Sequence, residues 1–477
     1  MLKTLLMRYP IVISFLLITT LFLSIGIIPD TDNSEENPDV LLIMLETARA
    51  DHFSCYGYER NTTPHMCEIA EEDGVIFEKA YSQGSMTSLS VPSFLTSETP
   101  NKVGSSEWEP IPEDKETVSE VLQREGYRTR GNYHVGVEGL DWFRGIEHIY
   151  HTEYLSGTID PNPANLSSDE HEVNESVQIS DNLDFLDQIF SEDDPDFIWH
   201  FSRQKVHGPW IPESQDRKWS NESFESDRTE STEDLLQWQS SEKHDFDTLS
   251  DFYDGEIRTA DRKIGEIRDY LEKKDRYEDT MIIITSDHGE AFGQHDRPYH
   301  GWEPYEHQIH VPLIIKFPDN QYSGTEVEEP VRLVDVVPTI YDYISIQEVP
   351  EAEGESLLPI LDDESERLNN TVFAAGARGG GEESGPWGIR RDDYKYILKN
   401  PYENCIDNSR SDQELYHLPS DPDETEDISS ENSDKASSLN NELCGFFEEG
   451  LNITEEETSE ELSEGARKRL EALGYLS

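Results

Sequence analysis

Two short, uninterrupted apolar runs constrain the fold of this chain more than any other feature of its sequence. Residues 40–45 read VLLIML and residues 281–285 read MIIIT. Such runs are typical of strands buried on both faces, as in a parallel sheet covered by helices. Strand-like stretches at 127–132, 197–201 and 313–317 lie among stretches of helical spacing at 116–125 and from Ile257 onward. The alternation predicts an α/β fold, with helices on both faces of a mostly parallel central sheet.

The charge of the chain excludes one class of partner. Its 477 residues include 102 Asp and Glu but only 38 Lys and Arg, a formal net charge of −64. Nucleic acid is therefore not an expected partner, because neutralising its phosphates requires Lys and Arg. The 21 Tyr, 18 Phe and 8 Trp argue for a folded protein. A carboxylate-covered surface is typical of proteins adapted to very high salt, where charge repulsion is screened over short distances.

The beginning of the chain predicts a membrane anchor. Residues 11–28 are apolar and uncharged, follow Lys3 and Arg8, and precede no Ala-x-Ala cleavage site. The run is near the lower length limit for a span, so we favour an uncleaved anchor at 1–29 over a cleaved signal. The positive start would keep that end inside, which places the rest of the chain outside the cell, or secreted if the segment is cleaved.

The remaining chain divides by composition. After a linker at 30–38 we expect the main domain at 39–345, with acidic insertions near 157–194 and 213–250, and a smaller subdomain at 346–477. That subdomain is predicted to hold strands at 372–375 and 394–398 and a closing helix at 460–473.

Cysteines and glycosylation sequons suit an exterior location. Four cysteines allow three disulfide pairings. Our guess is Cys55 with Cys67 and Cys405 with Cys444, with buried free thiols as the alternative. The six Asn-x-Ser/Thr sequons begin at Asn61, Asn165, Asn174, Asn221, Asn369 and Asn452.

Polar residues follow the two clearest strands at the edge where parallel sheets bind ligands. Glu46 follows the first strand, and Asp287 and His288 follow the second. Their oxygen and imidazole donors could converge on one divalent cation. Taken singly, each has an ordinary alternative: a solvated carboxylate, or a turn with a helix cap.

Three further stretches could complete such a site. Residues 84–93 form a hydroxyl-rich loop that should open a helix, where a hydroxyl beside a metal is a plausible nucleophile. Lys205 and His207 lie in one polar cluster and His300 in another, and both clusters could hold an anion. Alone, the hydroxyls would be a loop or cap, and the histidines surface or core residues.

Together these stretches resemble the sulfatase-like branch of the alkaline phosphatase superfamily, in its haloarchaeal type. The matching motifs include LLIMLETARADHFSCYGYERNTTPH, TSLSVPSFLTS, KVHGPW, TSDHGEAFGQHDRPYHGWEPYEHQIHVPLII and ELYHLPSDPDETEDIS. The resemblance extends along nearly all of the chain after the anchor. The resemblance implies an alkaline-phosphatase-like α/β/α sandwich with a smaller C-terminal subdomain.

The same resemblance implies roles for individual residues. Metal ligands would be Glu46, Thr87, Asp287 and His288. Lys205, His207 and His300 would contact the anionic group, with His207 and His300 also serving catalysis, and Arg49 would steady the charges nearby. Zn or Mn would suit these donors better than Ca, because imidazole is a poor Ca ligand.

The departures from the sulfatase pattern lie at the residues expected to carry out the reaction. Ser90-Val91-Pro92-Ser93-Phe94 resembles the serine form of the formylglycine motif, but Phe94 replaces its Arg. When residues 93–97 are instead aligned with the matching helix of the family, the nucleophile position falls on Thr87. Threonine cannot become formylglycine. Threonine is the nucleophile of related phosphoethanolamine and phosphoglycerol transferases, so we prefer Thr87 to Ser90.

Three functions are consistent with these residues. The first is a metal-dependent hydrolase of a sulfate or phosphate ester, acting through a metal-bound hydroxyl outside the cell. The second is a transferase that modifies an envelope glycan or lipid with a phosphorus-containing group. The third is an inactive sulfatase fold that serves as a binding module, which the intact Glu46, Asp287 and His288 count against.

Overall fold

The computed structural model describes residues 37–103, 110–133, 142–152, 176–179, 195–202, 206–208, 210, 212–219, 246–362, 370–376, 385–401, 404–405 and 412–457. The predicted anchor at 11–28, Lys205 and the predicted closing helix at 460–473 lie outside these ranges. Within the described part, no helix is both long and apolar enough to cross a membrane.

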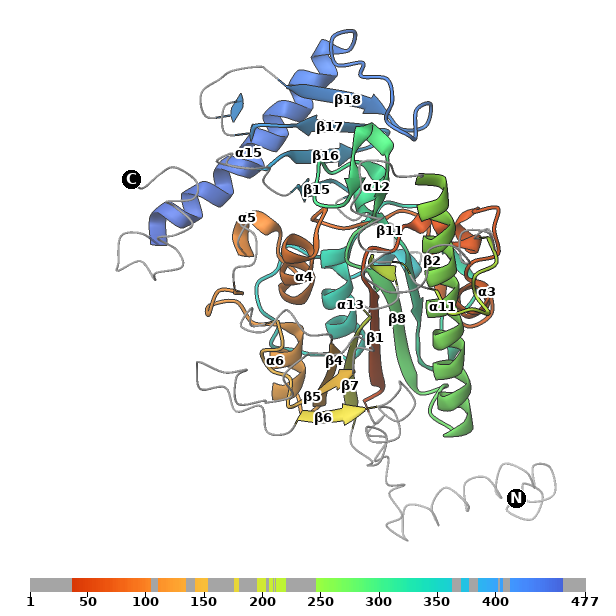
Figure 1. The fold of residues 1–477 in the computed structure, drawn as a ribbon. Coiled ribbons are helices and arrows are strands. Elements are labelled where there is room, and N and C mark those ends of the chain that lie inside the picture. Colours follow the sequence, from red (N-terminus) through yellow and green to blue (C-terminus); the bar gives the residue numbers. More distant parts are fainter. Residues whose placement is uncertain are drawn as a thin grey trace, which may run out of the picture. The chain divides into compact units, whose positions relative to one another are not determined.

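A mixed sheet forms the centre of the fold (Figure 1), and over the described residues it has nine strands. From edge to edge these are β13 (Thr325–Val327), β2 (Val75–Phe77), β12 (Leu313–Lys316), β8 (Thr280–Ser286), β1 (Asp39–Leu45), β7 (Asp196–Ser202), β4 (Arg128–Tyr133), β5 (His148–Thr152) and β6 (Ser176–Ile179). Parallel pairs join β8 through to β6, and β13 to β2. Among these strands, β12 alone runs antiparallel to both of its neighbours.

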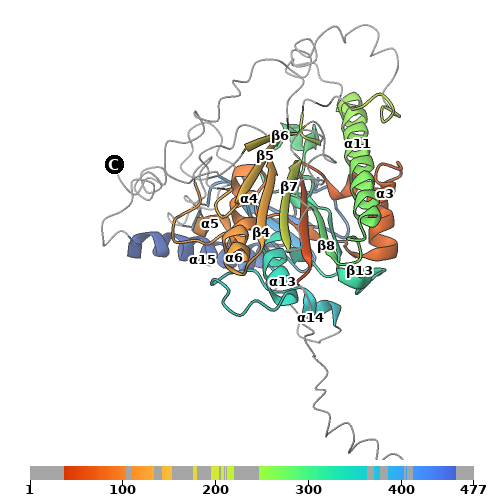
Figure 2. The same cartoon turned by 90° about the horizontal axis from the view of Figure 1, so that it is seen from below.

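Helices cover both faces of this sheet, as Figure 2 shows. On one face pack α4 (Thr87–Thr96), α6 (Val118–Arg124) and α13 (Val336–Tyr343), and on the other α3 (Pro64–Glu68) and α11 (Phe246–Lys273). Alternate residues of β1 enter the two cores, Val40 and Leu42 on the first face and Leu41 and Ile43 on the second. Continuous apolarity in β1 therefore reflects burial on both faces, which confirms the predicted α/β class.

The reversed strand β12 departs from the simplest parallel pattern for a physical reason. A parallel return requires a crossover, usually a helix, that carries the chain back to the start of the sheet. Between β8 and β12 the chain instead forms short elements: β9 (Ala291–Phe292), η5 (Gln294–Asp296), β10 (Pro298–Tyr299), α12 (Glu306–Ile309) and β11 (His310–Val311). Because no long helix intervenes in this fully described stretch, β12 re-enters the sheet in the opposite direction. Strand β11 pairs with β3 (Ala80–Tyr81), which also pairs with β14 (Val331–Arg332).

A second, four-stranded antiparallel sheet follows at the C-terminal side. Its strands are β15 (Val372–Ala375), β16 (Trp387–Arg391), β17 (Tyr394–Leu398) and β18 (Gln413–His417), and α15 (Ser433–Glu457) packs against it. The sequence predicted β15 and β17 but not β16, β18 and α15. The buried side chains Leu439, Leu443 and Phe447 at helical spacing were the available signal for α15.

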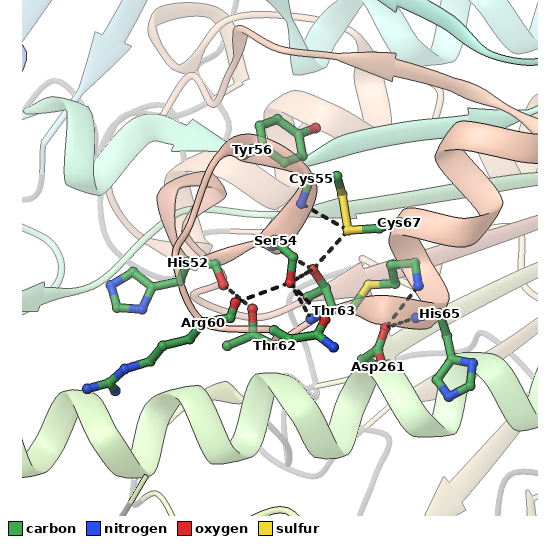
Figure 3. Close-up of a disulfide and its surroundings, with 12 residues drawn as sticks. His52, Ser54, Cys55, Tyr56, Arg60, Thr62, Thr63, His65, Cys67 and Asp261 are labelled. Atoms are coloured by element: carbon green, nitrogen blue, oxygen red, sulfur yellow. Dashed lines mark hydrogen bonds between the residues drawn. A yellow bond between two sulfur atoms is a disulfide. The ribbon is translucent and has the colours of Figure 1, made fainter. Parts of the chain in front are cut away.

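Both disulfides match the pairing that we guessed, Cys55 with Cys67 and Cys405 with Cys444. Figure 3 shows the first of them beside the start of α3. There Asp261 of α11 accepts the backbone N–H groups of His65 and Met66, each at 2.9 Å. The disulfide thus ties the loop after β1 to α3, and the hydrogen bonds to Asp261 hold α3 against α11.

His200 of β7 provides a test of this core. It is buried, and burial lowers the pKa of its imidazole to about 4, against about 6.5 in an unfolded chain. Between these values the unfolded state binds a proton that the folded state does not, so stability falls as pH falls. On going from pH 6.5 to 4, we expect wild type to lose about 2–3 kcal/mol more unfolding free energy than His200→Asn. Denaturant titrations at both pH values would measure this, with His148→Asn as the control. Equal losses in all three proteins would show that His200 does not stay neutral.

Candidate active site

The register of β1 against β8 creates the centre of the site. Leu45 pairs with Ser286 in this parallel pair, so the next residues, Glu46 and Asp287, leave the sheet side by side. Both are buried. Ser286 strengthens the junction, since its Oγ donates to the Leu45 carbonyl at 2.5 Å and accepts the Ala48 N–H at 2.7 Å.

Thr47 adopts a left-handed backbone conformation, with φ of 65°. This is uncommon for a β-branched residue and persists only where the surroundings impose it. Its N–H donates to Asp287 Oδ1 at 3.0 Å, and its carbonyl accepts from the Tyr253 hydroxyl at 2.7 Å. That hydroxyl in turn accepts the Arg49 N–H at 2.8 Å. Tyr253, from α11, therefore holds the turn that orients Asp287.

Asp287 and His288 present defined atoms to the site. Asp287 Oδ1 accepts the His288 N–H as well as that of Thr47, and burial raises the pKa of this carboxyl. His288 Nδ1 donates to the Gly289 carbonyl at 2.8 Å, which leaves Nε2 as an acceptor. Burial, together with the nearby His300 ring, lowers the pKa of His288 to about 3, so the ring is neutral.

Thr87 is the first residue of α4 and lies between these groups. Its Oγ1 is 3.1 Å from His288 Nε2 and 3.4 Å from Glu46 Oε1. Ser90, the alternative nucleophile, instead donates to the Asp287 carbonyl at 2.5 Å and accepts from Ser82 at 2.9 Å. The geometry thus places the Thr87 hydroxyl among the donors and gives Ser90 a structural role.

Both histidines that were predicted to contact the anion lie beside the donors. His207 Nε2 is 3.8 Å from Glu46 Oε1, and the His300 ring lies 5.1 Å from that of His207 and 4.6 Å from that of His288. His300 Nδ1 faces both oxygens of buried Glu290 at 3.2 Å. Glu290 thereby orients the ring, a role that the sequence alone did not reveal. The contribution of Lys205 stays a prediction.

Arg49 has its own partners within the loop. Its guanidinium binds the Asp51 carboxylate at 2.8 and 2.6 Å and donates to the Glu290 carbonyl at 3.0 Å. These contacts fix the loop after β1, and substrate binding by Arg49 stays a prediction.

The donor set fits a divalent cation. Glu46, Thr87, Asp287 and His288 offer two carboxylates, a hydroxyl and a neutral imidazole whose other nitrogen is fixed by a carbonyl, as metal-bound histidines usually are. Buried Asp287 Oδ2 lies 3.4 Å from His288 Nε2 and receives no hydrogen bond of normal geometry from the described residues. These four residues could therefore hold Zn²⁺ or Mn²⁺.

A second group of ligand atoms lies elsewhere in the described part of the chain, at His295, His307 and Glu424. No sequence pattern indicated this group, because Glu424 is far from the two histidines along the chain and the three residues form no motif. The Tyr253 contact was missed for the same reason.

The fold is that of the hydrolases of the alkaline phosphatase superfamily. More narrowly, the sulfatase family profile matches residues 38–346, and the chain belongs to the sulfatase family. The profile of the N-sulphoglucosamine sulphohydrolase C-terminal region matches residues 294–448.

Among curated relatives, N-acetylglucosamine-6-O-sulfatase of Bacteroides thetaiotaomicron is 22% identical over 82% of this chain and 83% of its own length. Arylsulfatase K of Mus musculus is 30% identical over 40% of this chain, a match that spans only 34% of that relative. Phosphonate monoester hydrolase of Agrobacterium radiobacter has a similar fold, with a TM-score of 0.63, 19% identity, and coverage of 88% of this chain and 96% of its own. A structure solved with D-glucosamine-2-N,6-O-disulfate has a TM-score of 0.65 at 19% identity, covering 87% and 99%.

Tyr253→Phe tests the support of the Thr47 turn. The change leaves the Arg49 N–H and the Thr47 carbonyl without their partner, so we expect a loss of about 2–4 kcal/mol in unfolding free energy. Tyr127→Phe is the control, because it removes a single bond, to the Pro38 carbonyl, and should cost about 1 kcal/mol. Denaturant titration measures both, and equal losses would contradict the role given to Tyr253.

Proposed function

We propose that this protein is a metal-dependent hydrolase of a sulfate ester, with the Thr87 hydroxyl as its nucleophile in place of formylglycine. The observation that carries the proposal is the position of Thr87 Oγ1, at the start of α4 and between Glu46 and His288. Membership of the sulfatase family supports a sulfate ester as substrate.

The reaction would proceed in two displacements. The Thr87 oxygen attacks sulfur, the bond from sulfur to the leaving alcohol breaks, and the sulfuryl group passes to Thr87. Water then attacks the same sulfur and releases sulfate, which regenerates the hydroxyl. A proton must reach the leaving oxygen in the first step, and His207 or His300 could supply it from beside the donors.

A divalent cation held by Glu46, Thr87, Asp287 and His288 would supply Lewis acidity and favour ionisation of the Thr87 hydroxyl. The N-terminal end of α4 favours the same negative charge. His207, His300 and Lys205 would hold the charged oxygens of the ester.

A second candidate is transfer or hydrolysis of a phosphorus-containing group. It is favoured by the departures from the sulfatase pattern at Thr87 and Phe94, because a simple hydroxyl nucleophile is that of the related phosphoethanolamine transferases. The similarity of its fold to that of a phosphonate monoester hydrolase supports this second candidate.

The substrate is proposed to be a sulfated or phosphorylated glycan or lipid outside the cell. One relative is a sulfatase of N-acetylglucosamine, which supports a glycan. An exterior location with an N-terminal anchor is proposed from the apolar run at residues 11–28. Adaptation to high salt is proposed from the net charge of −64, since screening would let an anionic substrate approach such a surface.

Turnover by variants at position 87 tests the proposal. We expect the full chain, in about 1 M salt or more with Zn²⁺ or Mn²⁺, to cleave an aryl sulfate. Thr87→Val keeps the shape but removes the hydroxyl, and should lower kcat/KM at least ~10³-fold. Thr87→Ser keeps a hydroxyl and should retain most activity, and Ser90→Ala is the control for the alternative nucleophile.

Other outcomes separate the alternatives. Cleavage of an aryl phosphodiester but not of the sulfate, or a phosphorylated Thr87 found by mass spectrometry, would establish phosphoryl chemistry. Full activity in Thr87→Val would refute the nucleophile. No turnover and no bound metal in wild type would favour the binding module.

A further inference from the structure

A compact group of ligand atoms lies outside the site described above. Ring nitrogens of His295 and His307 and a carboxylate oxygen of Glu424 all lie within 4.8 Å of one another. Ligands bound to one Zn²⁺ at bond lengths of about 2.0–2.1 Å stand roughly 3.3 Å apart, so small side-chain shifts would complete the geometry. His295 lies in η5 and His307 in α12, whereas Glu424 belongs to the segment between β18 and α15.

The His295 imidazole is oriented by its neighbours. Its ring stacks on Tyr305, with centroids 3.6 Å apart and planes 3° from parallel. His295 also adopts φ of 51°, which is uncommon for a residue other than glycine.

Glu424 supplies a buried carboxylate to the same place. Its side chain is 1% exposed, and one oxygen accepts the Glu306 N–H at 2.6 Å. The other oxygen lies 3.2 Å from Lys395 Nζ but has no hydrogen bond of normal geometry among the described residues. Lys395 is shared with Glu306 at 2.9 Å, so its charge is balanced by a second carboxylate.

We propose that His295, His307 and Glu424 form a second cation site, distinct from the site at Thr87, and that this site binds Zn²⁺. Two imidazoles and one carboxylate are a recurrent zinc ligand set, while Ca²⁺ and Mg²⁺ prefer oxygen ligands alone. Water would complete the coordination. The proposal does not depend on the chemistry at Thr87.

The position of the site gives the ion a function. His295 and His307 flank His300 in sequence, and Gly289, beside His288, donates its N–H to the Gln308 carbonyl at 2.8 Å. A bound zinc would tie Glu424, from the C-terminal region, to the segment that presents His300. It would therefore stabilise the fold and hold the segment from Gln294 to Ile309 in place.

Zinc titration of metal-free protein tests the site. The full chain carrying Asp287→Ala and His288→Ala serves as the background, because it removes two ligands of the other site. We expect this background to bind one Zn²⁺ and its Tm to rise with zinc. Adding His295→Asn should weaken zinc binding at least ~10–100-fold and abolish the rise in Tm. Asparagine tolerates the left-handed conformation of residue 295, so the backbone should be preserved.

His417→Asn in the same background is the matched control, since His417 lies on β18 outside the group, and it should change neither result. Co²⁺ can replace Zn²⁺ in the background protein, and its visible spectrum reports the ligands of the metal without a further variant. We expect that spectrum to show imidazole coordination. Zinc binding and a rise in Tm that survive His295→Asn would overturn the proposal, as would a background protein that binds no zinc.

Discussion

The pairing of β1 with β8 is the constraint on which the candidate active site depends. Both strands are buried along their whole length, so their side chains fill the two cores and fix the register. A one-residue slip would exchange the faces of every apolar side chain and would also separate Glu46 from Asp287. Ser286, which bonds to both the Leu45 carbonyl and the Ala48 N–H, fastens the two strands at the point where they end.

The predictable part of the fold was the part dominated by burial. The runs at 40–45 and 281–285 became β1 and β8 because a strand buried on both faces has few polar positions. Parallel strands end at the same edge of a sheet, so one site could be predicted there from Glu46, Asp287 and His288. Thr87 could be separated from Ser90 only through the family resemblance, because many hydroxyls occur in residues 84–93 and nothing local marks which one begins the helix.

What could not be predicted depends on contacts between distant segments. The direction of β12 follows from the short elements that precede it, which apolar runs do not reveal. In the sequence, Tyr253 is only one of the residues on the apolar face of an amphipathic helix. The structure shows that its hydroxyl bonds to both the Thr47 carbonyl and the Arg49 N–H. His295, His307 and Glu424 share no spacing, and it is the packing of the segment after β18 against α12 that brings them together.

Charge balance connects the two candidate cation sites to the composition of the chain. At the first, two buried carboxylates face a neutral imidazole, because burial keeps His288 unprotonated. Such a site would repel the anion of a sulfate or phosphate ester, and burial of the Asp287 carboxylate is unfavourable, as its raised pKa shows. A divalent cation would remove both difficulties at once, because its two positive charges would cancel those of the two carboxylates and the ester would no longer be repelled. A protein with 102 acidic residues and 38 basic ones has few side-chain cations for this purpose. Bound metal would be an alternative source of positive charge in such a chain, both at the candidate active site and at the proposed zinc site of His295, His307 and Glu424.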